Sequence, residues 1–270
     1  KYSSDGTKEW TRLLGDSGGG QTSENVATAS DGSVYITGYT IGDLDEQENS
    51  GSYDGFLSKY SSDGTKEWTR LIGGKSFDIA RTIATSSDGS VYIAGRSAST
   101  TLDDQTNSGS YDGFVVKFSS DGTKEWTKLI GTESFDHAYG LAVASDGSLF
   151  VTGRTSGDLD EQENSGNSDV FVIKYSSDGT KEWTKLIGSD SYDFGNSVVT
   201  ASDGSIYLAG TTLSSSLNGV DNANSEGIFL MKLAEAFAAN SGYATYSITG
   251  TRAVGNILTA AISSDDPDGN

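Results

Sequence analysis

The 270-residue sequence contains no cysteine, a single proline (Pro267) and a single histidine (His137). Without cysteine the chain has no disulfide, no thiolate nucleophile and no cysteine-ligated zinc, and one imidazole excludes a multi-histidine metal site. No apolar run approaches the roughly 20 residues of a membrane-spanning helix, and residues 1–270 contain no signal-peptide pattern. We therefore expect no direct membrane insertion, and metal or acid–base chemistry falls to carboxylates.

Positive charge is also scarce. The chain has 18 Lys and Arg against 38 Asp and Glu, which gives a formal net charge of −20. This charge repels phosphate backbones and anionic lipid surfaces and favours cations or basic partners, so nucleic acid is excluded as a partner. The 35 glycines, together with abundant Ser, Thr and Asp, favour tight hairpins over long helices.

A ten-residue motif, KYSSDGTKEW, occurs four times with little variation. It starts at Lys1, Lys59, Lys117 and Lys174, at intervals of 58, 58 and 57 residues, and a weaker version surrounds Lys232. A period of this length indicates stacked supersecondary units. The tryptophans all fall at one point of the repeat, so we expect each to fill an equivalent core position: Trp10, Trp68, Trp126 and Trp183.

Each period also contains two Asp-Gly pairs between stretches rich in Val, Ile, Tyr, Phe and Thr. We interpret these pairs as type I′ turns of β-hairpins, with both turn residues at positive φ. They begin at Asp5, Asp31, Asp63, Asp88, Asp121, Asp146, Asp178 and Asp203. Four strands per period follow. Radial repetition of four-stranded antiparallel sheets predicts an all-β fold, a β-propeller with four blade periods.

The segment GLAVASDGSLFVTGRTSGDLD, continued by SDVFVIKYSSDGTKEWTKLIG, resembles the bacterial SBBP β-propeller repeat family and, more distantly, NHL-type blades. The resemblance spans about residues 1–233. The NHL likeness implies that the strand near Ala138 to Ser145 is the innermost of its blade and that the Trp strand is outermost. The last blade lacks its Trp strand, so residues 7–15 either complete it and close a ring of four, or the chain is an arc of a larger ring.

The tail differs from the repeats. We expect a linker at residues 234–244 and, from 245 to 270, the truncated start of an Ig-like β-sandwich. The stretch YSITGTRAVGNILTAAISSDDPDGN resembles the opening strands of Ig-like or cadherin-like modules of bacterial surface proteins, of the kind found in large cyanobacterial adhesin-like proteins. Only about two strands of such a domain are covered.

Long acidic loops between the second and third strands place oxygen donors at positions 1, 3, 5, 7 and 12, as in a calcium loop. The alternative is a solvated acidic loop, because position 6 is Glu48 or Glu163 where an EF-hand loop needs glycine. No cofactor is required, and Ca²⁺ is the candidate. Its candidate ligands are Asp43, Asp45, Asn49, Asp54, Asp103, Asp112, Asp158, Asp160, Asn164 and Asp169.

A second candidate site precedes the inner strands. Asp78, Asp136 and Asp193 recur there beside Phe77, Phe135 and Tyr192, and His137 follows Asp136. In a ring these residues surround one mouth of the channel and are candidate ligand-binding residues. The alternative is structural: the aspartates accept backbone hydrogen bonds and the aromatics seal neighbouring blades.

We therefore expect a non-catalytic binding or scaffold module of an exported, adhesin-like bacterial surface protein, extracellular and stiffened by calcium, with a protein or glycan partner. The alternative is a carbohydrate-binding or carbohydrate-active propeller, a lectin or lyase, acting at the channel mouth around Asp136, His137 and Tyr139. No pattern selects a catalytic carboxylate pair. Regular repeats determine the fold strongly and the function weakly.

Overall fold

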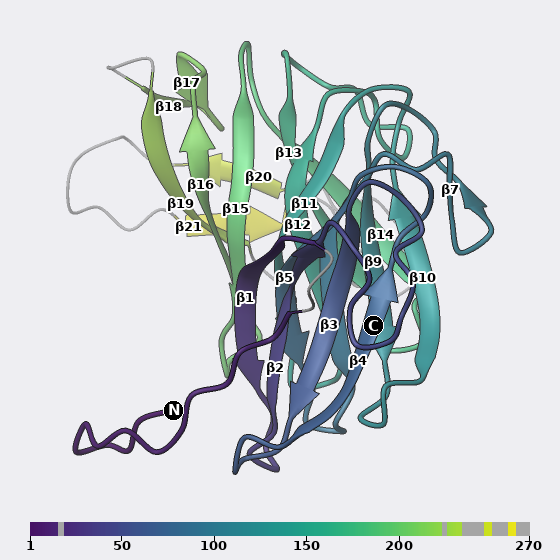
Figure 1. The fold of residues 1–270 in the computed structure, drawn as a ribbon. Helices are drawn as coiled ribbons and strands as arrows, with labels where there is room; N and C mark the ends of the chain where they lie inside the picture. The colour runs from purple at the N-terminus through teal and green to yellow at the C-terminus, as the bar shows by residue number, and fades with distance from the viewer. Residues whose placement is uncertain (16–18, 223–225, 234–245, 250–258, 263–270) are drawn as a thin grey trace. The chain divides into compact units, whose positions relative to one another are not determined.

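The structure is a computed structural model that describes residues 1–15, 19–222, 226–233, 246–249 and 259–262. The chain divides into two compact units, Lys1–Leu233 and Ala234–Asn270. Figure 1 shows the strands of the first unit arranged as neighbouring twisted sheets. The described residues include no helix with the length and hydropathy of a membrane span.

Four sheets follow one another along the first unit, and each is antiparallel in chain order. The first contains β1 (Gln21–Thr28), β2 (Val34–Thr40), β3 (Asp54–Tyr60) and β4 (Lys66–Ile72), and the second contains β5 (Asp78–Thr85), β6 (Val91–Ser97), β9 (Asp112–Phe118) and β10 (Lys124–Ile130). The third contains β11 (Asp136–Val143), β12 (Leu149–Thr155), β13 (Asp169–Tyr175) and β14 (Lys181–Ile187), and the fourth β15 (Asp193–Thr200), β16 (Ile206–Thr212) and β19 (Gly227–Leu233). Two short hairpins, β7 (Thr101–Leu102) with β8 (Gln105–Thr106) and β17 (Ser216–Leu217) with β18 (Val220–Asp221), lie in long loops.

The predicted propeller blades are confirmed: the described part of the first unit is all-β, with three four-stranded antiparallel sheets and one of three strands. Alternating and β-branched sequences such as Val-Phe-Val-Ile in β13 fit a strand buried on both faces. The first strands of successive sheets, β1, β5, β11 and β15, lie next to one another. The Trp strands β4, β10 and β14 form the outer edges, as predicted.

The core lies between the sheets rather than within them. Val170 and Val172 of the third sheet pack with Val198 and Leu208 of the fourth, and all four side chains are buried. Two similar clusters join the first sheet to the second and the second to the third. Each blade therefore depends on its neighbours for burial of its apolar faces.

The predicted type I′ geometry of the Asp-Gly pairs is wrong. In the β3–β4 hairpin only Gly64 has positive φ, at 83°. The amide of Gly64 donates to Ser61 O at 2.9 Å, and the Asp63 carboxylate accepts from the Thr65 amide at 2.9 Å. These bonds hold Asp63 in the helical region, which gives a type I turn closed by a glycine bulge. The I′ turns lie elsewhere, at Asp45–Glu46 and its three counterparts Asp103–Asp104, Asp160–Glu161 and Asn218–Gly219.

The expected closure of a four-bladed ring is not formed. Residues 7–15 make no strand pairing with β19, and no pairing joins the first and fourth sheets among the described residues. Trp10 instead donates from Nε1 to Ser62 O of the first sheet at 3.3 Å. The described arrangement is therefore an open arc. The alternative that it belongs to a larger ring stays a prediction.

The second unit contains one described antiparallel pair, β20 (Tyr246–Thr249) with β21 (Thr259–Ile262). The predicted linker at 234–244 lies outside the described residues. Most of the expected Ig-like segment does too.

Candidate functional site: the channel between the inner strands

Every inner strand contains a β-bulge at the same point. The pairing register shifts at Ser23/Asn25, Ala80/Thr82, Ala138/Gly140 and Gly195/Ser197. The extra residues at these four shifts are Glu24, Arg81, Tyr139 and Asn196. A bulge leaves its extra residue outside the ladder and re-aims its side chain.

A glycine on the second strand makes room for each bulge. A Cβ atom built on Gly153 would lie 1.9 Å from His137 O, so no other residue fits there while the backbones are this close. Gly38, Gly95 and Gly210 stand at the same point of the other three sheets, at 1.8–1.9 Å. The repeated Thr/Ala-Gly element of the second strand therefore makes room for the bulge.

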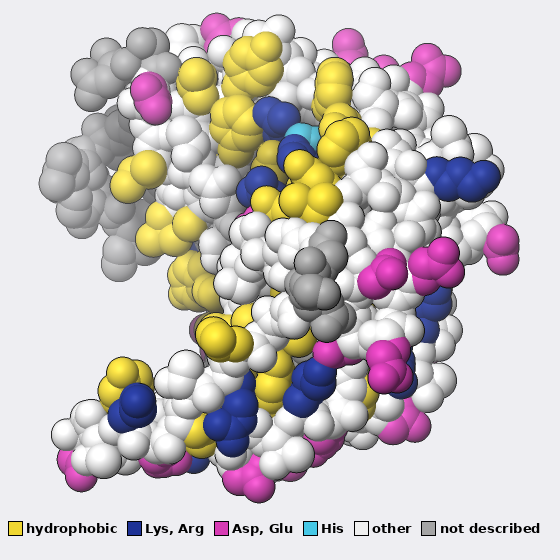
Figure 2. All heavy atoms as spheres, in the orientation of Figure 1, with side chains coloured by type: hydrophobic (Ala, Val, Ile, Leu, Met, Phe, Trp, Pro, Cys, Tyr) yellow, Lys and Arg dark blue, Asp and Glu magenta, His cyan; other side chains and the backbone are white. Residues whose placement is uncertain are grey.

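The four bulge residues line one cavity of about 370 Å³, which they share with Phe194. They come from all four inner strands, so the cavity lies on the channel between the blades. Figure 2 shows Lys and Arg side chains gathered beside the histidine, among hydrophobic side chains. The size suits a small ligand of one or two rings.

Three arginines near His137 stack on aromatic rings, and one of them, Arg81, lines this cavity. The guanidinium carbon of Arg81 lies 5.6 Å from the Tyr139 ring centroid, and that of Arg96 lies 5.2 Å from Tyr111. The carbon of Arg154 lies 5.1 Å from Phe194. Stacking fixes each planar fork while leaving its outer N–H groups available for a bound group.

His137 is buried at the centre of the cluster. Its Nδ1 lies 2.9 Å from the Tyr139 hydroxyl and 3.5 Å from Arg154 Nη2, and its ring meets Tyr111 edge to face at 5.6 Å. Burial, and then the positive charges of Arg154, Arg96 and Arg81, lower the pKa of His137 to about 3. The imidazole is therefore neutral at physiological pH and adds no positive charge.

The cluster is positive. The charge of Arg154 acts on the buried carboxyl group of Asp136 and opposes the rise in pKa that burial causes there. None of Arg81, Arg96 and Arg154 forms an ion pair among the described residues, and their Nε atoms are buried without hydrogen-bond partners. Glu24 is the one carboxylate that lines the described cavity. In a chain of net charge −20, three such guanidinium groups make a site for an anion.

The aspartates predicted at the channel mouth bond to the loops that precede them. Asp78, Asp136 and Asp193 are fully buried. Their Oδ2 atoms accept hydrogen bonds from amides of the preceding loop, for example Gly74 N at 2.8 Å and Thr132 N at 2.7 Å. These bonds agree with the structural alternative: the carboxylates close the turn that leads into each inner strand. Ligand binding by these aspartates stays a prediction.

The adjoining aromatics join neighbouring blades. Phe77 forms a parallel bridge with Tyr53 of the preceding blade, and their rings meet edge to face at 4.9 Å. Phe135 and Tyr192 form the same bridge with Tyr111 and Ser168. Phe135 stacks on Tyr111 and Tyr192 on Phe194, and both stay partly exposed. These two rings therefore extend the arginine cluster toward solvent.

The loops proposed for calcium are bonded internally. Asp45 pairs with Lys66 and accepts from the Thr69 hydroxyl of β4, whereas Asp43 accepts from the Asn49 amide at 2.9 Å. The carboxylate of Asp54 is buried at the start of β3. The same contacts recur at Asp103 with Lys124, at Asp160 with Lys181 and at Asp158 with Asn164, while Asp112 and Asp169 are buried like Asp54.

Among the described residues, no three acidic or histidine side chains converge as a metal site. Asn49 and Asn164 cap their own loops, each donating to a backbone carbonyl of the preceding strand. Calcium binding by these loops stays a prediction.

Comparison with known families gives a match to the model described as SBBP, beta-propeller repeat, at residues 9–45, 67–103 and 182–218. These three segments are SBBP β-propeller repeats. Each SBBP repeat straddles two blades: residues 67–103 hold the outer strand β4 of the first sheet and the strands β5 and β6 of the second. The repeat in sequence is thus offset from the blade in space.

Among curated proteins, the chain is similar to the regulatory protein FlaEY of Caulobacter vibrioides, with 29% identity over 206 residues. The match covers 68% of this chain and 21% of the relative, so the chain spans about a fifth of that protein's length. Among solved structures it is similar to a protein of unknown function from Bacteroides caccae, with 12% identity and a TM-score of 0.36, covering 70% of this chain and 53% of the other.

Proposed function

We propose that this SBBP-repeat chain is a non-catalytic binding module that holds an acidic carbohydrate at the arginine cluster of its channel. The observation that carries the proposal is the convergence of Arg81, Arg96 and Arg154 on His137, beside a cavity that Arg81 lines, with no ion pair from these arginines among the described residues. Guanidinium forks bind carboxylate and sulfate groups through paired N–H donors.

The rim of the site favours a sugar over a bare anion. Phe135 and Tyr192 are partly exposed. They stack on Tyr111 and Phe194, the rings against which Arg96 and Arg154 lie. Flat apolar faces beside charged donors suit a sugar ring, which presents C–H groups on one side and an acid group on another. The ligand class is therefore a uronic acid or a sulfated sugar unit.

Binding is favoured over catalysis by the state of the one imidazole. With a pKa of about 3, His137 is a weak base and an ineffective general acid near neutral pH. The lectin form of the carbohydrate interpretation is thus better supported than the lyase form.

The setting we propose is an exported, adhesin-like bacterial surface protein, with residues 245–270 opening an Ig-like module and calcium stiffening the acidic loops. A net charge of −20 supports a soluble, well-solvated display surface and disfavours nucleic acid. The partner in this setting is a cell-surface glycan.

Calorimetric titration of the chain with sodium glucuronate and with glucose tests the proposal. We expect binding of glucuronate and none of glucose. Arg96→Ala and Arg154→Ala should each weaken glucuronate binding at least tenfold, whereas Lys8→Ala removes one positive charge from an exposed position outside the site and should leave affinity unchanged. Equal loss in all three variants would reduce the effect to net charge, and no binding of glucuronate, galacturonate or a sulfated disaccharide would overturn the proposal.

A further inference from the structure

The two ends of the blade array expose the faces that are buried at every internal junction. On β19, Ile228 and Leu230 are 92% and 77% exposed. Their counterparts in β13, Val170 and Val172, are fully buried against the fourth sheet. The outer face of the fourth sheet is therefore an apolar blade surface without the neighbour that such surfaces have elsewhere in the described array.

The opposite face is exposed on the first sheet. Val26 of β1 is 60% exposed, whereas its counterparts Ile83, Leu141 and Val198 are at most 9% exposed. Val26, Val34, Ile36, Phe56 and Tyr60 line a cavity of about 520 Å³ together with Trp10 and Leu14. This cavity occupies the side of the first sheet that, in the next three sheets, is covered by the preceding blade.

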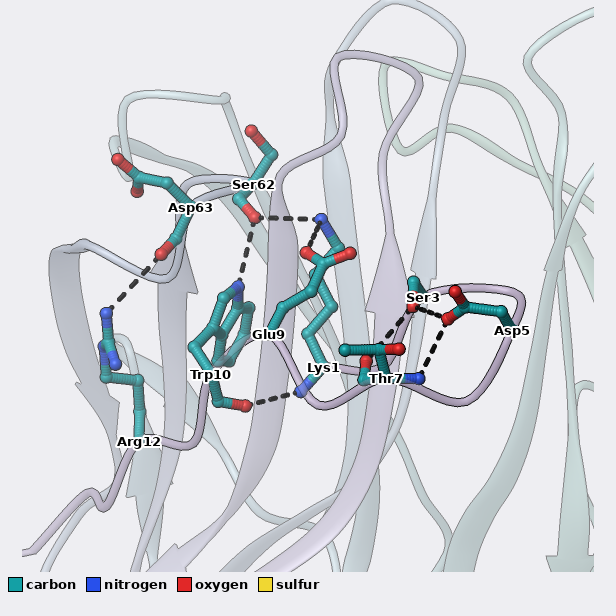
Figure 3. Close-up of polar contacts among 9 residues, drawn as sticks. All are labelled: Lys1, Ser3, Asp5, Thr7, Glu9, Trp10, Arg12, Ser62 and Asp63. Carbon is teal, nitrogen blue, oxygen red and sulfur yellow. Dashed lines mark hydrogen bonds and ion pairs between the residues drawn. The ribbon is translucent and has the colours of Figure 1, made fainter.

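The N-terminal segment already occupies part of that missing blade. Trp10 Nε1 donates to Ser62 O at 3.3 Å, as Figure 3 shows. Arg12 Nε donates to Gly64 O at 2.7 Å. Trp68 and Arg70 of β4 make the same two bonds to the next blade, at 3.3 Å to Ser120 O and 2.9 Å to Gly122 O. Residues 10–14 are thus seated as the outer strand of a blade that lacks its inner strands.

The fourth sheet lacks the strand that residues 10–14 resemble. It contains β15, β16 and β19 but no outer strand among the described residues. Its free edge is the edge that β4, β10 and β14 occupy in the other three sheets. An exposed strand edge pairs readily with a complementary strand. Residues 10–14 have the sequence of such an outer strand, so in a second copy they can pair with this edge.

We propose that two copies of this chain associate head to tail: the fourth sheet of one copy packs on the first sheet of a second, whose residues 11–14 pair with β19. The register follows from β13 and β14, where Ile173 pairs with Thr184 and Val172 with Lys185. Met231 then lies opposite Thr11 of the second copy, and Leu230 opposite Arg12. Lys1 and Tyr2 of the second copy hold the repeat positions of Lys232 and Leu233, so these two residues of the first copy must leave the end of β19, and the pairing ends at Met231.

The interface is heterologous, because it joins two different faces of the chain. Such an interface closes into a ring when the rotation per copy allows it and otherwise grows as a filament. It repeats the apolar contacts of the three internal junctions, and it is independent of the arginine cluster in the channel.

Single-cysteine variants test the pairing directly, since the chain has no cysteine of its own. In the first sheet the side-chain oxygens of Ser58 and Thr69, the counterparts of Met231 and Thr11, lie 2.8 Å apart, which is within the reach of a disulfide after substitution. We expect an oxidised mixture of Thr11→Cys and Met231→Cys chains to give mixed disulfide dimers. Val220→Cys is the control, because Val220 is exposed but lies outside both faces. A mixture of Thr11→Cys and Val220→Cys chains should give no mixed disulfide dimers.

Light scattering tests the faces themselves. We expect concentration-dependent association of the unaltered chain, loss of it in both Leu230→Lys and Val26→Lys, and a one-to-one dimer when these two variants are mixed, since each retains one intact face. Val220→Lys should associate normally. A monomer at all concentrations would overturn the proposal. So would a Thr11→Cys/Met231→Cys double variant that forms only an internal disulfide, because that outcome shows closure within one chain.

Discussion

Asp54 and Asp78 meet at the junction of the first and second blades, where both carboxylates are buried and both Oδ1 atoms lack a hydrogen-bond partner among the described residues. Burial raises the pKa of Asp54 to about 6, and the negative charge of Asp78 adds to the rise. The same pairing recurs at the next two junctions, where burial also raises the pKa of Asp112 and of Asp169. Each junction therefore favours one added proton.

The chain should become more stable as the pH falls from 7.5 to 5. A folded-state pKa of about 6 for Asp54, above the ordinary 3.8, means that the folded chain binds this proton first. The stabilisation is complete below pH 3.8 and is lost as the pH rises through 6. Asp54→Asn should remove about 1–3 kcal/mol of this pH dependence and stabilise the chain at pH 7.5.

Urea unfolding at the two pH values measures the effect of Asp54→Asn. The control is Glu46→Gln, at an exposed turn position. An unchanged difference between pH 5 and 7.5 in Asp54→Asn would show that Asp54 is ionised throughout.

Replacing Glu46, Asp104 and Glu161 by glycine should stabilise the chain. These residues hold φ angles of 61–62° at the second position of the I′ turns, where glycine carries no steric penalty. The triple variant should gain about 1–2 kcal/mol in free energy of unfolding. Glu48→Gly, in the same loop but outside the positive-φ region, should lose stability instead, and a gain there would point to loss of negative charge as the cause.

Trp68→Ala should destabilise the chain by about 2–4 kcal/mol. The indole packs 5.9 Å from Tyr35 between the first two sheets and donates to Ser120 O. Trp10→Ala loses the matching bond to Ser62 but lies on one sheet only, so we expect about half the effect. Chemical denaturation of both variants gives the comparison, and equal losses would contradict a role for burial between two blades.

Glucuronate affinity should change less than twofold between pH 5.5 and 8. The site depends on arginines, and His137, with a pKa of about 3, does not gain a proton in this range. Titration at four pH values provides the measurement. An affinity that rises below pH 6.5 and becomes flat in His137→Gln would show that the imidazole is charged when ligand is bound.

The repeats predicted the blades because their information is local. A strand pattern, a Trp strand and a hairpin glycine recur every 57 or 58 residues, and each blade repeats the same contacts. The turn type was harder to predict, since the Asp63 carboxylate holds its own residue in the helical region by accepting from Thr65. A dipeptide alone does not show which of its residues takes positive φ.

Sequence reasoning largely missed the arginine cluster, and the reason is physical. His137 and Tyr139 were singled out, but Arg81, Arg96 and Arg154 come from three strands and meet only after two blades pack. A signal was nevertheless present in the sequence. Aligned by repeat, the bulge position reads Glu24, Arg81, Tyr139 and Asn196, whereas the position two residues later is aliphatic in every copy: Val26, Ile83, Leu141 and Val198. The residues that differ between copies line the channel cavity, whereas the residues that repeat build the blades.

The offset between repeat and blade gives the array a simple rule of growth. Since residues 67–103 contribute to two sheets, duplication or loss of one whole repeat in the gene leaves every internal sheet with four strands and every junction with its apolar contacts. The array can therefore change in length without passing through a broken blade. Each added copy also brings one new bulge side chain into the channel, so binding specificity can diversify one residue at a time.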